Sequence, residues 1–264
     1  MPRLDGKILV ITGGTQGLGE VTALLAAESG AAGIVICGRQ QDKGKNVEAA
    51  IEDRGCPALY VPADLSREED CRQVVRACDE RFGRVDGLLN SAADTSRGNL
   101  QGTTVELWDY LFDVNVRGPF ILTQECVSIM RREKIEGGIV NILSVATYCG
   151  HPDLVAYSTT KGALSTFTTN CANALRDERI RVNGVILGWT DTPGEDAVRR
   201  KTGHADNWLE TAEKAMPFGR LIKSIDVARL SVYLLSEDSG IMTGSLVDFA
   251  QRVTSYVPPV PVDW

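Results

Sequence analysis

The 264-residue sequence lacks two features that would tie it to a membrane or to nucleic acid. No apolar run approaches the roughly 18 residues that a membrane-spanning helix needs, and the N-terminal residues contain no long apolar segment typical of a secretory signal. Lys and Arg total 28 against 35 Asp and Glu, which gives a net charge of −7. Proteins that bind nucleic acid or anionic membranes are usually basic. We therefore expect a cytoplasmic protein with no membrane or nucleic-acid partner.

Metal-binding and disulfide-forming residues are also scarce or scattered. Histidine occurs only at His151 and His204, which disfavours a site built from imidazoles. The cysteines are odd in number and none are arranged as Cys-x-x-Cys, which argues against a zinc cage or a disulfide framework. We expect no metal site and mostly buried free thiols at Cys37, Cys56, Cys71, Cys78, Cys126, Cys149 and Cys171.

Short apolar runs alternate with longer amphipathic stretches along most of the chain. The runs predict strands at residues 7–12, 33–37, 58–61, 87–90, 138–143, 181–187 and 245–249, and the stretches predict helices near 18–29, 42–54, 67–82, 105–132, 155–176 and 226–235. Strands that are apolar throughout belong in parallel sheets covered by helices on both faces. The sequence therefore predicts an α/β fold, a doubly wound, Rossmann-like parallel sheet of about seven strands, in a single domain spanning 1–264.

Two segments depart from this alternation. Residues 188–216 are polar and charged, and a stretch of that length inside a domain is usually a functional lid, sometimes helical, or a disordered loop. We predict a lid over the substrate. The C-terminal segment 250–264 is rich in proline and is expected to be extended or polyproline-like.

A glycine-rich turn follows the first expected strand, at Thr12-Gly-Gly-Thr-Gln-Gly-Leu-Gly19. Glycines at this joint permit a tight turn and let a pyrophosphate approach the backbone, where the free N–H groups of the next helix can bind it. The alternative is a tight strand–helix joint that binds no ligand. Because the glycine-rich turn lies between the first strand and the first helix, a dinucleotide cofactor is favoured.

The residue after the second strand predicts which dinucleotide binds. An acidic residue there would accept hydrogen bonds from a ribose 2′-hydroxyl, but the sequence has Gly38 and Arg39. A guanidinium can bind a 2′-phosphate through two hydrogen bonds. We therefore predict that NADP(H) is preferred and that NAD(H) is possible; the alternative is that Arg39 lies on the surface or stacks on adenine.

Three residues predict acid–base chemistry at the other end of the cofactor. Tyr157 and Lys161 are four residues apart at the start of an expected helix, so both side chains can approach one ligand. A neighbouring ammonium favours the phenolate form of a tyrosine. Ser144 follows an apolar strand and so lies at the sheet edge where ligands bind, positioned to hydrogen-bond a substrate carbonyl. It lacks the Gly-x-Ser-x-Gly pattern of a nucleophilic serine hydrolase.

With these residues the sequence resembles the short-chain dehydrogenase/reductase family from about Leu4 to Phe249. The matching elements, in the family's order and spacing, are the Thr12–Gly19 turn, Asp64-Leu65, Asn90-Ser-Ala-Ala93, Asn115, Ser144, Tyr157, Lys161, Arg181-Val-Asn183, Gly188 and Thr192. The chain departs from the family pattern at Ala93, where a glycine is usual, at Leu187, where a proline is usual, and at Ala250-Gln-Arg252, where Asp-Gly-Gly is frequent.

The resemblance implies a role for each matching residue. Tyr157 would exchange a proton with the substrate oxygen, Lys161 would bind the nicotinamide ribose and lower the pKa of Tyr157, Ser144 would polarise the carbonyl, and Asn115 would hold a water in a proton relay. The implied cofactor-binding residues are Gly13, Thr15, Gln16, Gly17, Leu18, Gly19, Arg39, Asp64, Leu65, Asn90, Ala92, Tyr157, Lys161, Gly188, Thr190 and Thr192. For Asn90 and Asn115 the alternative is a structural role within the fold. The resemblance also implies a homotetramer or homodimer formed through the helices that contain Asn115 and Tyr157.

The expected substrate pocket is polar with a few aromatic planes. It should include Asp94, Ala146, His151, Leu154 and Trp189, with Tyr148, Asp153 and the lid nearby. This set favours a hydroxylated substrate such as a sugar or polyol, oxidised or reduced between secondary alcohol and ketone. One alternative is a catalytically idle NAD(P)-binding sensor on the same fold. Enoyl reduction and sugar epimerisation are further alternatives; the first is disfavoured because Ala163 stands where the more distant lysine of that branch would be.

Overall fold

The computed structural model describes residues 3–148, 151–201, 203 and 205–251. Their centre is a seven-stranded, wholly parallel sheet in the order β3-β2-β1-β4-β5-β6-β9. Its strands are β1 (Ile8–Thr12), β2 (Gly33–Gly38), β3 (Ala58–Pro62), β4 (Gly87–Asn90), β5 (Gly138–Ser144), β6 (Arg181–Leu187) and β9 (Leu246–Phe249). Every predicted strand is present within about a residue of its expected ends, and the predicted fold class is confirmed.

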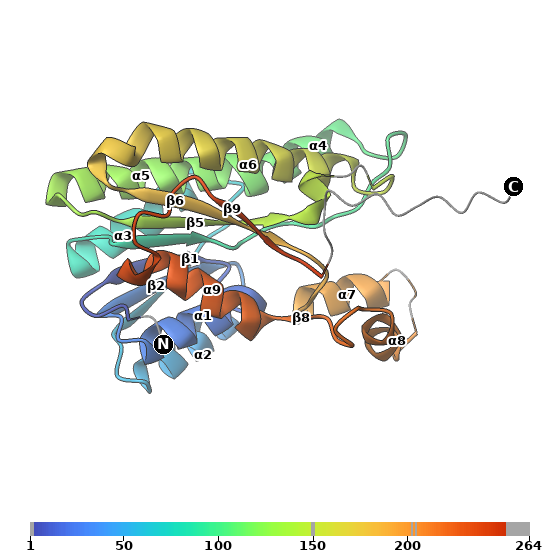
Figure 1. Cartoon of the computed structure of the whole chain (residues 1–264), viewed down its shortest axis with the longest axis horizontal. Coiled ribbons are helices and arrows are strands. Elements are labelled where there is room, and N and C mark those ends of the chain that lie inside the picture. The colour runs from blue at the N-terminus through green and yellow to red at the C-terminus, as the bar shows by residue number, and fades with distance from the viewer. Residues whose placement is uncertain (1–2, 149–150, 202, 204, 252–264) are drawn as a thin grey trace, which may run out of the picture.

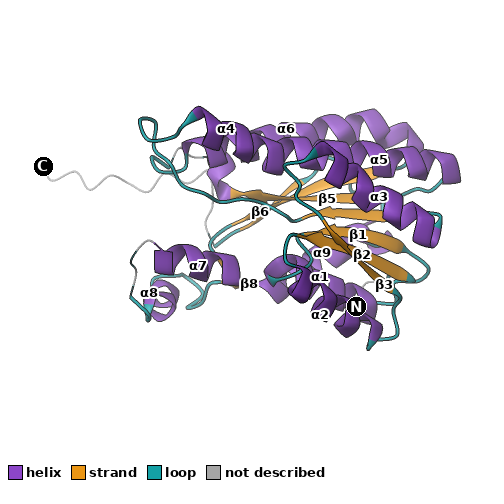
Figure 2. Ribbon diagram, turned by 180° about the vertical axis from the view of Figure 1, so that it is seen from behind, coloured by secondary structure: helices purple, strands orange, loops and turns teal. Residues whose placement is uncertain are grey.

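Helices cover both faces of this sheet (Figures 1 and 2). One face carries α1 (Gly17–Glu28), α2 (Gln41–Glu52) and α9 (Ser224–Leu235), and the other carries α3 (Glu68–Phe82), α4 (Val105–Phe112), α5 (Gly118–Glu133) and α6 (Val155–Leu175). The central strands are therefore buried on both sides, which is why the runs in β1 and β2 are apolar without alternation. The thiols of Cys37, Cys71 and Cys126 lie in the same core and, like the other described cysteines, are free.

The strand order reverses between β1 and its neighbour β4. From β1 the chain winds outward to β2 and β3, then returns across β1 and winds the other way through β5 and β6. Open sheets of this kind bind ligands in the crevice at the carboxyl ends of the strands where the order reverses. That edge is the one beside α7 (Pro193–Lys201) and α8 (Trp208–Lys214) in Figure 1.

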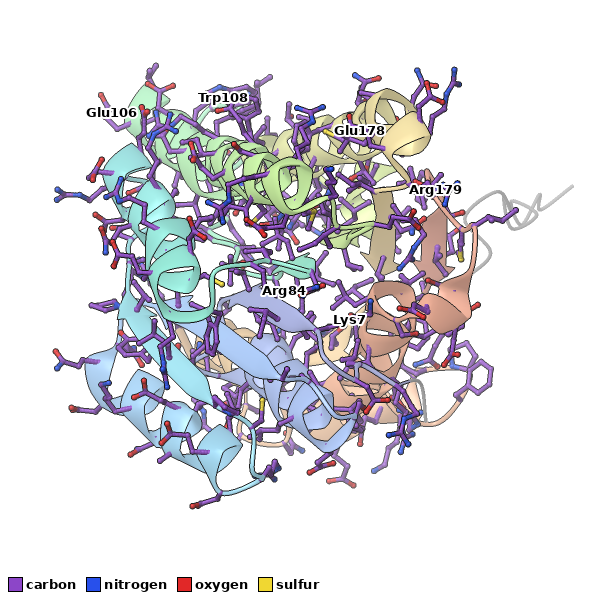
Figure 3. The ribbon with its side chains drawn as sticks, turned by 90° about the vertical axis from the view of Figure 1, so that its left-hand side faces the viewer. Lys7, Arg84, Glu106, Trp108, Glu178 and Arg179 are labelled. Carbon is purple, nitrogen blue, oxygen red and sulfur yellow. The ribbon has the colours of Figure 1, made fainter. Side chains whose placement is uncertain are left out.

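Charged side chains lie at the opposite side of the sheet, at the amino ends of its strands (Figure 3). The buried carboxylate of Asp86 accepts a hydrogen bond from the Ile8 backbone at 2.9 Å and pairs with Arg84 at 2.6 Å. Lys7 pairs with Glu237 at 3.2 Å. The Asp86 contact joins the starts of β1 and β4, and the Lys7–Glu237 pair joins the start of β1 to the turn after α9. All lie on the side away from the ligand crevice, so we assign them a structural role.

The helix expected over 105–132 is one of two regions that differ from the prediction. It is divided into α4 and α5 by a π-helical turn at Asp113–Arg117. Pro119 follows and has no N–H to donate to the carbonyl of Asn115 four residues earlier, so regular α-helical bonding cannot continue through this point. π-helical turns of this kind are frequent at functional sites.

The polar segment 188–216 is the second such region. Where described, it forms β7 (Thr190–Asp191), α7 and α8, and β7 pairs with β8 (Ile222–Lys223) in a separate two-stranded sheet. The sequence did not predict β7 or β8. The proline-rich tail from residue 252 lies outside the described residues. Among the described helices, none is long and apolar enough to cross a membrane.

Candidate active site

A cavity of about 600 Å³ opens at the carboxyl ends of β1, β4, β5 and β6. All but two of the predicted site residues line it. They are Gly13, Thr15, Gln16, Gly17, Leu18, Gly19, Arg39, Asp64, Leu65, Ala92, Asp94, Ser144, Ala146, His151, Leu154, Tyr157, Lys161, Gly188, Trp189, Thr190 and Thr192. The structure therefore brings together residues that are up to 179 positions apart in the sequence, from Gly13 to Thr192.

The glycine-rich turn forms one end of the cavity. Gly13 and Gly17 have φ values of 65° and 60°, a backbone conformation that side chains with a Cβ rarely adopt. A Cβ on Gly19 would lie 2.4 Å from the Gly13 carbonyl oxygen. Gln16 precedes α1 without capping it through its side chain, which leaves the first N–H groups of the helix for a ligand. This cradle fits a dinucleotide pyrophosphate.

Arg39 lies at the end of β2, where an adenosine ribose would bind. Its Nη1 atom donates a hydrogen bond to the Tyr110 hydroxyl at 3.0 Å. A Cβ on Gly38 would lie 2.8 Å from the Thr15 hydroxyl, so glycine allows the close approach of β2 to the turn. Lys43 donates to Gln16 Oε1 at 2.8 Å and adds a second cation near this end. The described residues here include two cations that suit a phosphate.

Ser144 and Tyr157 meet on the wall at the end of β5. Ser144 Oγ accepts a hydrogen bond from the Ala146 N–H at 3.2 Å, which fixes the short turn after the strand. Burial raises the pKa of the Tyr157 phenol; a hydrogen bond with Ser144 opposes this, and the negative charge of Glu195 adds to it. The phenol is therefore protonated near neutral pH in the protein alone.

Lys161 lies one helical turn from Tyr157 and is only 3% exposed. Its Nζ atom donates to the Ile142 carbonyl at 2.8 Å and lies 5.8 Å from the centre of the Tyr157 ring. Burial lowers the lysine pKa from 10.5 to about 8. The family resemblance implied that Lys161 lowers the pKa of Tyr157 in the working enzyme, which stays a prediction; in the protein alone, burial is the largest effect on the phenol and raises its pKa.

Asn115 and Asn90 are the two predicted residues that do not line the cavity. The Asn115 side chain bonds to both the N–H and the carbonyl of Asp94, each at 2.9 Å, and to the Thr160 hydroxyl at 3.2 Å. Asn90 donates to Asn141 Oδ1 at 2.8 Å within the sheet. Both side chains lie behind the cavity wall and fix its position.

The cavity is also lined by residues that were not predicted individually: Arg97 and Tyr110, and within the predicted lid Glu195 and Arg199. Three of these lie in irregular or lid segments, where no periodicity indicated which side chains point inward. Conversely, Tyr148 and Asp153 do not line the cavity although they were expected near it. Tyr148 is instead 49% exposed.

Arg199 and Glu195 form a compact group with two tryptophans on the lid side. The guanidinium of Arg199 lies 4.5 Å from the Trp189 ring and 5.8 Å from the Trp208 ring, and the two rings stack at 6.1 Å. Glu195 Oε1 accepts hydrogen bonds from Arg199 at 2.7 Å and Trp189 at 2.9 Å. Among the described residues, no cluster of His, Cys, Asp and Glu could hold a metal ion.

Comparisons with known proteins agree with this geometry. Residues 13–249 match the family described as Enoyl-(Acyl carrier protein) reductase. The NADP-dependent (R)-specific alcohol dehydrogenase of Lentilactobacillus kefiri is 32% identical over 92% of this chain and 94% of its own. The 3-oxoacyl-[acyl-carrier-protein] reductase FabG of Thermotoga maritima is 32% identical over 93% and 96%.

Solved structures show the same likeness over nearly the whole chain. A short-chain type dehydrogenase/reductase from Mycobacterium marinum superposes with a TM-score of 0.86 at 26% identity, covering 94% of this chain and 96% of the other. Levodione reductase gives the same TM-score and identity, covering 94% and 97%.

Proposed function

The chain belongs to the short-chain dehydrogenase/reductase family, and from this premise we propose that it interconverts a secondary alcohol and a ketone with NADP(H). The observation that carries the proposal is the meeting of Ser144, Tyr157 and Lys161 on one wall of the cavity. When bound, the nicotinamide supplies or accepts the hydride. The residues of the chain orient the carbonyl and move the proton.

In the reductive direction, the substrate carbonyl oxygen accepts hydrogen bonds from Ser144 and Tyr157. Because burial keeps the phenol protonated, Tyr157 can donate its proton as negative charge develops on that oxygen. The adjacent Lys161 ammonium then stabilises the phenolate that remains. In the oxidative direction the same phenolate takes the proton of the alcohol. Asn115 holds the Asp94 segment of the wall in place, and the proton relay implied for it is part of this proposal.

NADP(H) is the proposed preferred cofactor, with NAD(H) possible. Support comes from Arg39 and Lys43 near the glycine-rich turn and from the name of the Lentilactobacillus kefiri relative. The turn residues and the start of α1 would hold the pyrophosphate, Asp64 and Leu65 the adenine, and Thr190 and Thr192 the carboxamide. Asn90, which lies behind the wall, would act on the cofactor only through the residues in front of it.

The proposed substrate is a polar hydroxylated compound such as a sugar or polyol. Asp94, His151 and Trp189 line the substrate end and supply polar and aromatic groups. Enoyl reduction is less well supported, because Tyr157 and Lys161 lie one helical turn apart at the spacing expected for ketone reduction. A catalytically idle sensor would need none of the acid–base groups that the cavity contains.

The remaining expectations are also part of this proposal. The chain would be one domain with residues 188–216 as a lid, working in the cytoplasm as a homotetramer or homodimer. Exposed aromatic side chains support self-association: Phe120 on α5 is 45% exposed and packs edge-on against Phe167 of α6. Free thiols throughout the described residues suit a reducing compartment.

The test is a fluorescence titration of the purified protein with NADPH and NADH, followed by a panel of ketones, sugars and polyols read at 340 nm. Tight NADPH binding with turnover supports the proposal. Binding without turnover on any member of the panel supports the sensor instead. Failure to bind either nucleotide contradicts both.

A further inference from the structure

The substrate end of the cavity contains more positive than negative charge, although the chain as a whole carries −7. Three cations, Arg97, Arg199 and Lys161, line it against two carboxylates, those of Glu195 and Asp94. Glu195 is the one of these carboxylates that pairs with the arginines, whereas the Asp94 carboxylate accepts a hydrogen bond from the Ser96 N–H at 2.9 Å. A cavity with one sign of charge concentrates ligands of the other sign.

Glu195 cannot balance both arginines. Its Oε1 atom already accepts from Arg199 and from the Trp189 indole. Arg97 Nη2 approaches the same oxygen only to 3.9 Å, which is too long for a hydrogen bond. Within the described residues, the Arg97 guanidinium has no other carboxylate partner, although its side chain is only 32% exposed. The Arg97 guanidinium therefore lies beside a carboxylate that it shares with Arg199, without a hydrogen bond to it.

Arg97 is also held close to the acid–base residues. The next residue, Gly98, forms a bridge with Leu154, accepting from the Val155 N–H at 3.2 Å and donating to the Asp153 carbonyl at 2.9 Å. Val155 begins the helix that carries Tyr157. The backbone at Arg97 is thus fixed to the segment that positions the catalytic phenol, with its side chain turned toward the lid residue Glu195.

We infer that the substrate carries a carboxylate besides the reacting carbonyl or alcohol, and that Arg97 binds it; this inference rests on the proposed function. The single positive charge of the Arg97 guanidinium matches that of one carboxylate, which it can hold through two hydrogen bonds. A phosphate monoester would bring nearly twice that charge. This narrows the proposed class of substrate, a polar hydroxylated compound, to hydroxy acids and oxo acids.

The test compares matched probes at three distances between carboxylate and ketone. Pyruvate, acetoacetate and levulinate are each paired with their methyl esters, and reduction by NADPH is followed at 340 nm. Thermal shifts of the protein with NADP⁺ and each probe measure binding independently of turnover. For at least one pair we expect kcat/KM to favour the acid by roughly tenfold or more, as for a charge-assisted hydrogen bond.

Two cavity variants distinguish a binding role from a simple contact between wall and lid. Arg97→Gln should lower the acid-to-ester ratio about 10- to 100-fold, with partial recovery in Arg97→Lys. Glu195→Gln keeps an acceptor for Trp189 and Arg199 but removes the competing charge, so the ratio should rise by about 3- to 10-fold. Arg76→Gln, on the exposed surface of α3, is the matched control and should leave the ratio unchanged.

The outcomes separate the two proposals. The carboxylate site would be overturned if kcat/KM favoured the esters over the acids. It would also be overturned if Arg97→Gln and Glu195→Gln each changed kcat/KM for the acid and for its ester in the same direction. An Arg97-dependent thermal shift with acids alone, without reduction of any probe, would support the site and contradict the proposed reaction. If the esters were reduced, and neither kcat/KM nor the thermal shift showed a preference for acids that depends on Arg97, the proposed reaction would be supported and the carboxylate site contradicted.

Discussion

The Lys161 ammonium lies 5.8 Å from the centre of the Tyr157 ring and donates its hydrogen bond to a backbone carbonyl, that of Ile142. Within the described residues no carboxylate is its ion-pair partner, and burial alone accounts for the shift of its pKa. Burial removes hydration from the ammonium that this one hydrogen bond replaces only in part, which is why its pKa is lowered to about 8. The pair is thus prepared for a reaction in which the tyrosine itself becomes the anion.

Lys161 should make the stability of the protein depend on pH. Between pH 8 and 10.5 the unfolded chain binds more protons at this lysine than the folded chain does, so its contribution to the free energy of unfolding increases with pH. The stabilising change is complete above 10.5 and is lost as the pH falls through 8. Relative to Lys161→Met, wild type should gain about 2 kcal/mol between pH 7.5 and 10 in urea unfolding. Exposed Lys214→Met is the control; a difference independent of pH would contradict the lowered pKa.

Tyr157→Phe removes the proposed proton donor and little else. We expect kcat to fall by about 10²- to 10⁴-fold, the usual contribution of a positioned acid or base, with the Kd for NADPH nearly unchanged. Turnover is measured at 340 nm and cofactor binding by fluorescence. Tyr148→Phe, outside the cavity, is the control. Substantial turnover in Tyr157→Phe would exclude the phenol from the chemistry.

Glu195 raises the pKa of Tyr157, so its removal should have the opposite effect. In Glu195→Gln the phenolate forms more easily, and the rising limb of the pH–rate profile for alcohol oxidation should move to lower pH. The profile of kcat/KM across pH 6–10 measures the shift. Glu210→Gln on α8, whose carboxylate pairs with Lys214 at the surface, should show no displacement. If the rising limb did not move in Glu195→Gln, a group other than Tyr157 would determine its position on the pH scale.

Arg39→Asp replaces a cation near the proposed 2′-phosphate by an anion. We expect the ratio of kcat/KM for NADPH to that for NADH to fall about 100-fold, because charge-assisted hydrogen bonds are lost and repulsion is added. Tyr110→Phe removes only the hydroxyl that holds Arg39 and should lower the ratio less. An unchanged ratio in Arg39→Asp would contradict the assignment of NADP(H).

Asn90→Ala should weaken the fold more than cofactor binding. The change leaves the buried Asn141 Oδ1 atom without its donor, which costs roughly 1–3 kcal/mol in the free energy of unfolding. We expect this loss in urea unfolding and a Kd for NADPH within about twofold of wild type after correction for the folded fraction. If Kd rose tenfold while stability did not change, Asn90 would contact the cofactor directly.

The sequence allowed most of the sheet to be predicted because several strands contain short, uninterrupted apolar runs such as Ile8–Ile11, bounded by glycine or polar residues. Strand ends in a parallel sheet also fix where following residues lie, which placed Ser144 correctly. The position of Arg97 had no such indication, because its loop has no period and is fixed by contacts distant in sequence, such as the bridge from Gly98 to Leu154. The direction of the Tyr157 pKa likewise depends on burial that the sequence does not show.

The pairing of β7 with β8 has a consequence for how substrate preference can change. Thr190 lies opposite Ile222, so the segment between them leaves and re-enters the fold at neighbouring positions. Lys223 reinforces this junction through Asp191 at 2.9 Å and Glu213 at 2.6 Å. The segment carrying Glu195 and Arg199 is therefore an exchangeable module: its length and charge can be replaced, by evolution or by grafting from a relative, without altering the register of any strand that holds the catalytic residues.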